Sequence, residues 1–512
     1  MDRIKIIFVF ITSLISITAY ALNSNNPFIL QKQTGFARFS FDSLKMPNNV
    51  QNMGLLGINY FDDITPLIYG GVGGYGSITG TQGGLFVLGI GGGLHHELFY
   101  HLVGDLGLFV GGGGGHSALV GGGFMYRPQV GLSYQWKDFR LGAHYSYIDF
   151  TTGQIHSQQV GVDLDVLLDF YYMYPHWPNC GYTLHDLGLV CDKYFNLDRN
   201  DFALLLQFYP EKAGTKDTGG QLQDGTIGLI GAEFDHYFKD QIFWWVQTAG
   251  AYRGVHNGFM DLLGGLGLRW PLTHWLAVVP QIGVGAGGGG NVDTGGGVLV
   301  DPILGLEVPL TSHFAARLSG GYIWAPRGTF AAENVTAEIL YHLNMIEGSD
   351  HPGCCFSNCY WIQNWRVQVL NQTYIHPQRS SDNVESSANL VAVQLDQLFT
   401  PYFFFSYQGA SAYAGYYTGG LASGLVGPGI QSPQFFNNHL QVFGEFLVGA
   451  AGGGGLAVGG GAVIEPEVGI HYAFNPRFGL QVSAGQLKAL HAGLSTAVIN
   501  AGLTVSFGTA NQ

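Results

Sequence analysis

The stretch "LFVGGGGGHSALVGGGFMYRP", residues 108–128, decides the fold. It returns as "VGAGGGGNVDTGGGVLVDP" at 284–302 and as "VGAAGGGGLAVGGGAVIEP" at 448–466. Glycine weakens the interior of both helices and strands, so a chain rarely places so many of them together. A pattern of two glycine runs and a proline that occurs three times indicates one structural unit used three times.

The segments around the glycine runs repeat in the same order. The copies open on "TGFARFSFDS" from 34, "DFALLLQFYP" from 201 and "WRVQVLNQTY" from 365, and they close on "VGVDLDVLLDF", "VTAEILYHLNM" and "VINAGLTVSFG". We therefore divide the chain into repeats of about 145 residues. The predicted division is a signal peptide at 1–21, repeats at 32–172, 200–345 and 365–509, and Cys-containing linkers at 173–199 and 346–364.

Within a copy the hydrophobic period is two. In the first copy one face would carry Val120, Gly122, Phe124, Tyr126, Pro128, Val130, Leu132 and Tyr134, and the other Gly121, Gly123, Met125, Arg127, Gln129, Gly131, Ser133 and Gln135. An apolar face opposite a small or polar face predicts a strand between lipid and a barrel interior. About eight such segments fit each copy.

The composition favours a membrane β-barrel over other classes. Only 11% of the 512 residues are charged and 14% are aromatic, whereas soluble domains carry about 25% charged residues. After the N-terminus no apolar stretch reaches the roughly 20 residues of a membrane helix. The net charge of −14, without basic runs, argues against a nucleic-acid partner.

The N-terminus has the pattern of an export signal. "MDRIK" is positively charged, "IIFVFITSLISIT" is apolar, and "AYA" at 19–21 offers small residues for cleavage. We predict a secretory signal peptide over 1–21.

The alternation, and aromatic residues at turns such as "HELFYH" from 96 and "WKDF" from 136, carry a resemblance to a known class. The chain resembles a bacterial outer-membrane β-barrel protein, and each copy is similar to a small eight-stranded barrel of that class. The resemblance covers roughly 34–508. It implies an all-β, antiparallel up-and-down barrel in the outer membrane, with lipid, lipopolysaccharide and the barrel-assembly machinery as partners. The glycine-rich hairpins would lie at the outer end.

Two architectures fit three copies of about eight strands: three tandem eight-stranded barrels, or one barrel of about 24 strands. The long joins at 171–200 and 346–364, and inward positions rich in Gly, Ala and Ser, favour the tandem form. In either form glycine would let strands coil and walls approach, and would supply positive φ at hairpin tips. "GGGGGHSA" lacks the Lys-Ser/Thr of a phosphate-binding loop.

All five cysteines fall in the two joins, outside the predicted strands: Cys180, Cys191, Cys354, Cys355 and Cys359. In an exported protein we predict one disulfide between Cys180 and Cys191 and a second between Cys359 and one of the adjacent pair. The odd number leaves one thiol, which could pair with another molecule. A metal site near the histidines of the joins is the alternative.

No constellation of catalytic or cofactor-binding residues is recognisable, so we expect a protein that is not an enzyme and carries no cofactor or metal. The pair His116–Ser117 has no counterpart in the other copies. The candidate lumen-lining residues are Arg127, Asp301, Glu465, Glu307, Glu467 and His471. Buried charges in a narrow lumen need partners.

Two functions remain. The first is a structural or surface-interaction role for sealed barrels, with an unspecified surface ligand. The second is a passive porin-like channel for small solutes through one large barrel.

Overall fold

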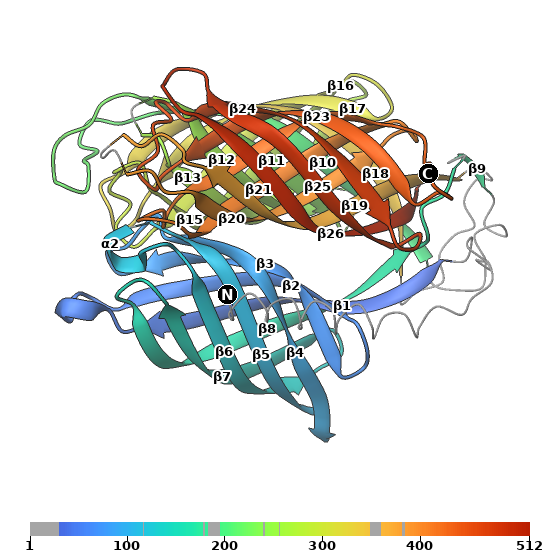
Figure 1. Ribbon diagram of the computed structural model, residues 1–512, viewed down its shortest axis with the longest axis horizontal. Coiled ribbons are helices and arrows are strands. Elements are labelled where there is room, and N and C mark those ends of the chain that lie inside the picture. The colour runs from blue at the N-terminus through green and yellow to red at the C-terminus, as the bar shows by residue number, and fades with distance from the viewer. Residues whose placement is uncertain are drawn as a thin grey trace.

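A computed structural model describes most of the chain as antiparallel strands (Figure 1). In its described part no helix is long and apolar enough to cross a membrane. The predicted signal peptide and Cys191, Cys354, Cys355 and Cys359 lie outside the described residues. The described residues are 30–115, 117–177, 180–182, 195–238, 241–254, 256–348, 360–380 and 384–511.

The first eight strands form a closed barrel, here called ring 1. Strand β1 pairs with both β2 and β8, so the sheet returns to its start. This closure rules out one barrel of about 24 strands, because no free edge of ring 1 is left to join the remaining sheet. The strands are β1 (Gln31–Leu44), β2 (Met53–Asp63), β3 (Ile68–Thr79), β4 (Phe86–Phe99), β5 (Leu102–Gly114), β6 (Met125–Gln135), β7 (Phe139–Phe150) and β8 (His156–Tyr172).

The strands from β10 to β18 are called ring 2, because β10 pairs with both β11 and β18. Strands β13 and β14 are separated only by Arg269 and both pair with β15, so they share one position in the sheet. The bounds are β10 (Phe195–Pro210), β11 (Thr226–Tyr237), β12 (Ile242–Arg253), β13 (Met260–Leu268), β14 (Trp270–Thr273), β15 (Leu276–Gly288), β16 (Val298–Pro309), β17 (Phe314–Trp324) and β18 (Ala331–Gly348).

The strands from β19 to β26 are called ring 3, because β19 pairs with both β20 and β26. A short strand, β9 (Cys180–Tyr182), pairs with β19, so Cys180 begins a strand where we expected none. The bounds are β19 (Tyr360–Ile375), β20 (Ala388–Leu398), β21 (Phe403–Ala414), β22 (Ala422–Gln431), β23 (Leu440–Gly452), β24 (Ala462–Ala473), β25 (Phe478–Ala489) and β26 (Ser495–Asn511).

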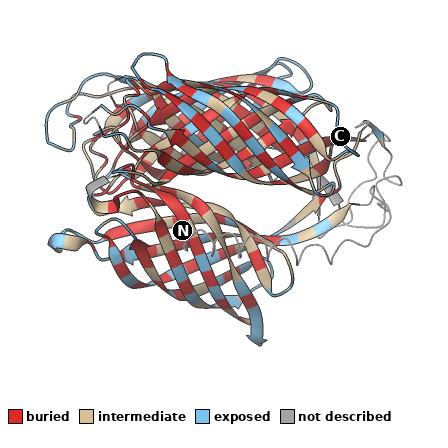
Figure 2. Cartoon of the chain, in the orientation of Figure 1, coloured by how far each residue is buried: buried red, intermediate tan, exposed pale blue. Residues whose placement is uncertain are grey.

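The strands alternate between an apolar outer face and a buried inner face (Figure 2). In β6, Val130 and Leu132 are each 54% exposed, whereas Arg127 is 2% exposed. The strand expected from Val120 begins only at Met125, after a one-turn helix, α2 (Ser117–Val120). The glycine triplet that follows α2 has positive φ at Gly121 and Gly123, a conformation that does not continue a strand.

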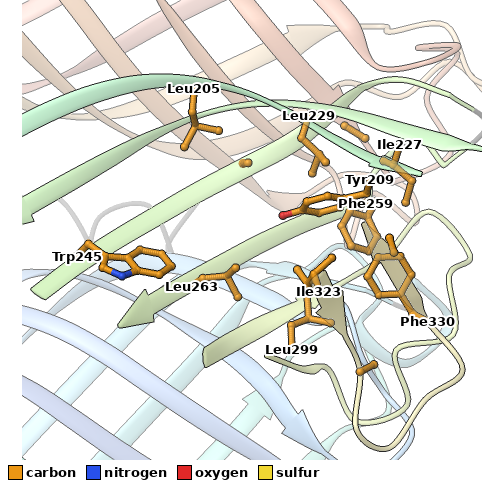
Figure 3. Packing of buried hydrophobic residues seen from close by; sticks show 14 of the residues in the cluster. Leu205, Tyr209, Ile227, Leu229, Trp245, Phe259, Leu263, Leu299, Ile323 and Phe330 are labelled. Carbon is orange, nitrogen blue, oxygen red and sulfur yellow. The ribbon is translucent and has the colours of Figure 1, made fainter. Parts of the chain in front are cut away.

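Each ring has two ends. The turn end carries the short connections, such as the one between β4 and β5, and the loop end carries the glycine-rich connections. In each ring a cluster of buried apolar side chains reaches the loop end. In ring 2 this cluster includes Tyr209, Phe259, Leu299 and Phe330 (Figure 3). The interior is therefore packed at that end.

The three rings touch at both ends. At the turn end, Met173, which follows ring 1, bridges Gly508 of ring 3, and Met345 of ring 2 pairs with Asn511 of ring 3. At the loop end, connections of ring 1 lie beside those of the other two rings (Figure 1). The rings thus form one assembly within a single chain.

Candidate functional site

An ion-pair network crosses the interior of ring 1. The Arg38 guanidinium on β1 donates to Asp165 on the neighbouring β8, with Nε 2.7 Å from Oδ1. The same group donates to Asp105 on β5, with Nη1 3.1 Å from Oδ1. Since β1 and β5 lie on opposite walls of the ring, Arg38 spans the lumen.

A second network of ring 1 surrounds Asp42 on β1. Arg127 on β6 donates to its carboxylate, with Nε 2.9 Å from Oδ2. The His144 ring lies between Asp42 and Asp163, at 2.9 and 2.8 Å, and the Ser146 hydroxyl donates to Asp42 at 2.8 Å. These side chains are buried. Burying a charged group costs free energy, and ion pairs and hydrogen bonds of this kind offset that cost.

Ring 2 is centred on one arginine. The Arg317 guanidinium on β17 lies 2.9 Å from Glu233 and 2.8 Å from Asp235, both on β11. It also reaches Glu338 at 3.3 Å and Glu307 at 3.5 Å. Its side chain has no solvent exposure, so it fills the middle of the ring and pairs with the carboxyl groups around it.

Ring 3 holds its carboxyl groups differently. Arg366 pairs with Asp396 at 2.7 Å. The other buried carboxyls of the interior receive hydrogen bonds from amides and hydroxyls, as when Gln394 on β20 donates to Glu445 on β23 at 3.2 Å. Polar side chains again reach across the lumen.

The structure places all six candidate lumen residues inside the rings, and it distributes them over all three. The partners given below lie in the same ring as the candidate residue itself, so the six residues do not form one common site. Their partners are Asp42 for Arg127 (2.9 Å), Asn334 for Asp301 (2.7 Å), Arg269 for Glu307 (2.7 Å), Gln372 for Glu465 (2.9 Å), Ser483 and Asn500 for Glu467 (2.7 Å each) and Thr504 for His471 (2.8 Å).

The proline after each charged residue marks the same interruption in every ring. Pro128, Pro302 and Pro466 are exposed on the outer face. The pairing with the next strand skips each proline and the residue before it. Proline has no N–H to donate to a ladder, which accounts for the break.

Sequence reasoning missed most of the charged network, including Arg38, Asp105, Asp165, Arg317 and Arg366. A signal was present in "VGVDLDVLLDF", where Asp163 and Asp165 alternate with apolar residues that face outward. Charged residues at inward positions of a predicted strand could have been collected as one set. Their partners could not, because they lie on strands distant in sequence.

The interiors can fill, neutralise and rigidify the rings. Among the described residues, no group of three or more His, Cys, Asp or Glu side chains is placed to hold a metal ion. The structure combines closed antiparallel sheets, an apolar outer surface and a polar, packed interior. These are the features of a transmembrane β-barrel.

Comparisons with known proteins give structural likenesses only. No protein-family model matches the chain, and no curated protein matches it. The siderophore receptor PirA from Acinetobacter baumannii is similar with a TM-score of 0.28 and 10% identity, over 93% of this chain and 80% of that one. OpdQ from Pseudomonas aeruginosa is similar with a TM-score of 0.20 and 10% identity, over 95% of this chain and 100% of that one. OccAB4 from Acinetobacter baumannii is similar with a TM-score of 0.22 and 8% identity, over 94% of this chain and 98% of that one.

Proposed function

We propose that this chain is a non-enzymatic structural protein of a bacterial outer membrane, made of three sealed eight-stranded barrels in tandem. The observation that carries the proposal is the apolar cluster that closes the loop end of each ring. A water-filled channel needs a continuous polar path, and these clusters interrupt it. The alternative is a passive porin-like channel for small solutes.

The polar networks support the same function. The lumen of ring 1 is crossed by Arg38 and that of ring 2 by Arg317. Moving Arg317 would leave Glu233, Asp235 and Glu338 buried without a cation, which costs several kcal/mol. Moving Arg38 would remove the arginine that joins Asp105 to Asp165. Static ion pairs of this kind suit a rigid wall rather than a gate.

The outer surface of the rings would lie in the membrane. The exposed apolar residues of the strands would contact membrane lipid, and the glycine-rich end would face lipopolysaccharide and the cell exterior. A surface ligand, if the protein binds one, would meet loop-end side chains such as the exposed Tyr416 and Tyr417, whose rings lie 4.9 Å apart.

Conductance in a planar lipid bilayer tests the proposal. We expect no stable current steps from refolded full-length protein whose insertion is verified by heat-modifiable migration and β-type circular dichroism. Steps of about a nanosiemens, as a wide aqueous lumen gives, would overturn the sealed form and favour the porin-like function. An open porin inserted under the same conditions shows whether the assay detects an open lumen.

A further inference from the structure

The three rings meet at the loop end through equivalent pairs of connections. In each ring the connection between the third and fourth strand lies against the connection between the fifth and sixth strand of the next ring. Ring 1 docks on ring 2 in this way, ring 2 on ring 3, and ring 3 on ring 1. The third-to-fourth connections are 80–85, 254–259 and 415–421, and the fifth-to-sixth connections are 115–124, 289–297 and 453–461.

One hydrogen bond recurs at each junction. The Gly83 N–H of ring 1 donates to the Gly295 carbonyl of ring 2 at 2.9 Å, and the Gly419 N–H of ring 3 donates to the Gly121 carbonyl of ring 1 at 2.9 Å. At the third junction the Asn257 side-chain amide of ring 2 donates to the Gly459 carbonyl of ring 3 at 2.7 Å.

The accepting residue is the first glycine of each "GGG" triplet. The three have nearly the same φ, which is +61° at Gly121, +60° at Gly295 and +62° at Gly459. This left-handed conformation favours glycine. The first glycine of each triplet is therefore required by its backbone conformation, and its carbonyl accepts the hydrogen bond from the neighbouring ring.

The third glycine of each triplet lies against the backbone of the neighbouring ring. A Cβ atom at Gly297 would fall 2.4 Å from the Ser77 carbonyl oxygen of ring 1, and one at Gly461 would fall 2.1 Å from the Ala251 carbonyl oxygen of ring 2. At Gly123 the corresponding atom is the Ala412 carbonyl oxygen of ring 3, at 2.3 Å. Backbone cannot move aside as a flexible side chain can, so no other residue fits.

Below the triplet, third and fifth strands of adjacent rings touch at one position where only one partner carries a side chain. Gly76 on β3 faces Ala286 on β15, and a Cβ at Gly76 would lie 3.0 Å from the Ala286 Cβ. Gly250 on β12 faces Ala450 on β23, at 3.4 Å. At these two junctions the glycine is on the third strand of its ring and the alanine is on the fifth strand of the next.

At that third junction the glycine is on the fifth strand. A Cβ at Gly112 on β5 would lie 2.7 Å from the Ser411 carbonyl oxygen and from the Ala412 backbone of β21. Ser411 is the counterpart of Gly76 because Ala412 and Ser77, one residue further on, donate N–H groups to the equivalent carbonyls of Leu421 and Leu85. Every junction thus pairs one glycine with one residue that has a Cβ.

We propose that this pairing is a recognition code by which each ring accepts one specific neighbour, a copy of its own repeat. The reverse order of docking would bring Ser411 of ring 3 against Ala286 of ring 2, with a side chain on both strands. It would also leave Gly250 against Gly112, with a side chain on neither. Overpacking and a void both lower stability, so the observed order is favoured. The code does not depend on whether the lumens conduct.

A double-mutant cycle in the full-length, lipid-reconstituted protein tests the code. Gly76→Ala sets two methyl groups against each other and should open the junction of rings 1 and 2. We expect amide hydrogen exchange in 80–85 and 294–298 to become about tenfold faster, an opening of the local kind that exchange reports. Gly76→Ala with Ala286→Gly restores one side chain per junction and should return exchange to the wild-type rate.

Two controls separate the code from general damage. Gly320→Ala on β17 adds a methyl group with no atom within 4 Å, and it should change nothing. The Phe86 ring, 3.3 Å from the added atom within ring 1, is present in both the single and the double variant, so recovery cannot come from it. Heat-modifiable migration reports whether the barrels remain folded.

The outcomes decide the proposal. Faster exchange in Gly76→Ala together with recovery in the double variant supports it. Unchanged exchange in Gly76→Ala, or equal acceleration in the single and double variants, overturns it. Gly297→Ala should accelerate exchange without rescue by Ala286→Gly, because its clash is with backbone.

Discussion

In ring 1 the buried carboxylates meet cations, whereas in ring 3 most of them meet amides and hydroxyls. Asp42, Asp105 and Asp165 each accept from an arginine. In ring 3, Glu445 accepts from Ser406 at 2.8 Å, and Glu467 accepts from Ser483. The same barrel shape is therefore filled by two kinds of polar network.

The difference shows that repeats can differ in the polar side chains of their interiors while they keep the same barrel of strands. A lumen of this width constrains the volume of its side chains more than their charge. An ion pair and a carboxyl held by amides satisfy the same hydrogen-bonding requirement. They differ in the cost of losing one member, because an uncompensated buried charge is the more expensive defect.

The largest effect is expected for Arg38→Met in ring 1. Asp165 would lose both of its close hydrogen bonds, which come from Arg38. We expect the free energy of unfolding to fall by about 3–5 kcal/mol. Urea unfolding in detergent, resolved by hydrogen exchange of the ring 1 strands, measures it. A loss below about 1 kcal/mol would contradict the role of Arg38 as a bridge.

A smaller loss is expected for the matched change Arg366→Met in ring 3. Asp396 would keep donors from Gln368, Gln394 and Ser406 at 2.6, 2.9 and 2.9 Å. The expected loss is about 1–3 kcal/mol, by the same unfolding measurement. If Arg366→Met costs as much as Arg38→Met, the contrast between the two rings is wrong.

Glu465→Gln should be neutral or should stabilise ring 3 by up to about 1 kcal/mol. Its Oε2 atom has no hydrogen-bond partner and the side chain is fully buried, so an amide of the same shape brings no charge that burial would penalise. The Gln372 amide could still donate to the remaining oxygen. Asp165→Asn in ring 1 is the control, and it should destabilise because Arg38 loses the nearer of its two anions and keeps only Asp105.

The smallest effect concerns a charge pair outside the strands, at the loop end of ring 2. Burial alone would lower the pKa of His256, but hydrogen bonding and charge from Glu211 and the Gly290 carbonyl outweigh it and raise the pKa. The raised pKa means that the stabilisation is complete below the ordinary histidine pKa and is lost as the pH rises through the higher folded-state value. Exchange in 254–259 should therefore accelerate severalfold toward alkaline pH.

His256→Gln is the matched variant, because Gln82 occupies the equivalent place in ring 1. Its exchange should follow only the intrinsic pH dependence of amide hydrogens. A wild-type profile that runs parallel to that of His256→Gln would show that the histidine charge does not hold this connection.

The barrel fold could be predicted from the sequence because alternation is a local property. In β6 the neighbours Arg127 and Val130 face opposite sides for reasons of backbone geometry alone. The start of that strand was missed, since the residues before it form a one-turn helix and a glycine turn with positive φ at Gly121. The predicted signal peptide and disulfides stay predictions.

The candidate lumen residues could be predicted as a set but not as a network. Asp301 and Glu465 are recognisable from their place before a proline, yet nothing local indicates that Asn334 or Gln372 would bind them. Those partners come from strands that ring closure brings together, and closure is a property of the whole sheet.

The sequence by itself determined the period of two, the threefold repetition and the apolar outer face of the strands, because each depends on residues close together in the chain. Only the tertiary structure decided that β1 closes on β8, that Arg38 spans the lumen, and that the glycine triplets accept the backbone of a neighbouring ring. The physical reason is distance along the chain. Contacts between strands and rings join residues that no local pattern relates, and their fit is fixed by sterics and charge after the rings have formed.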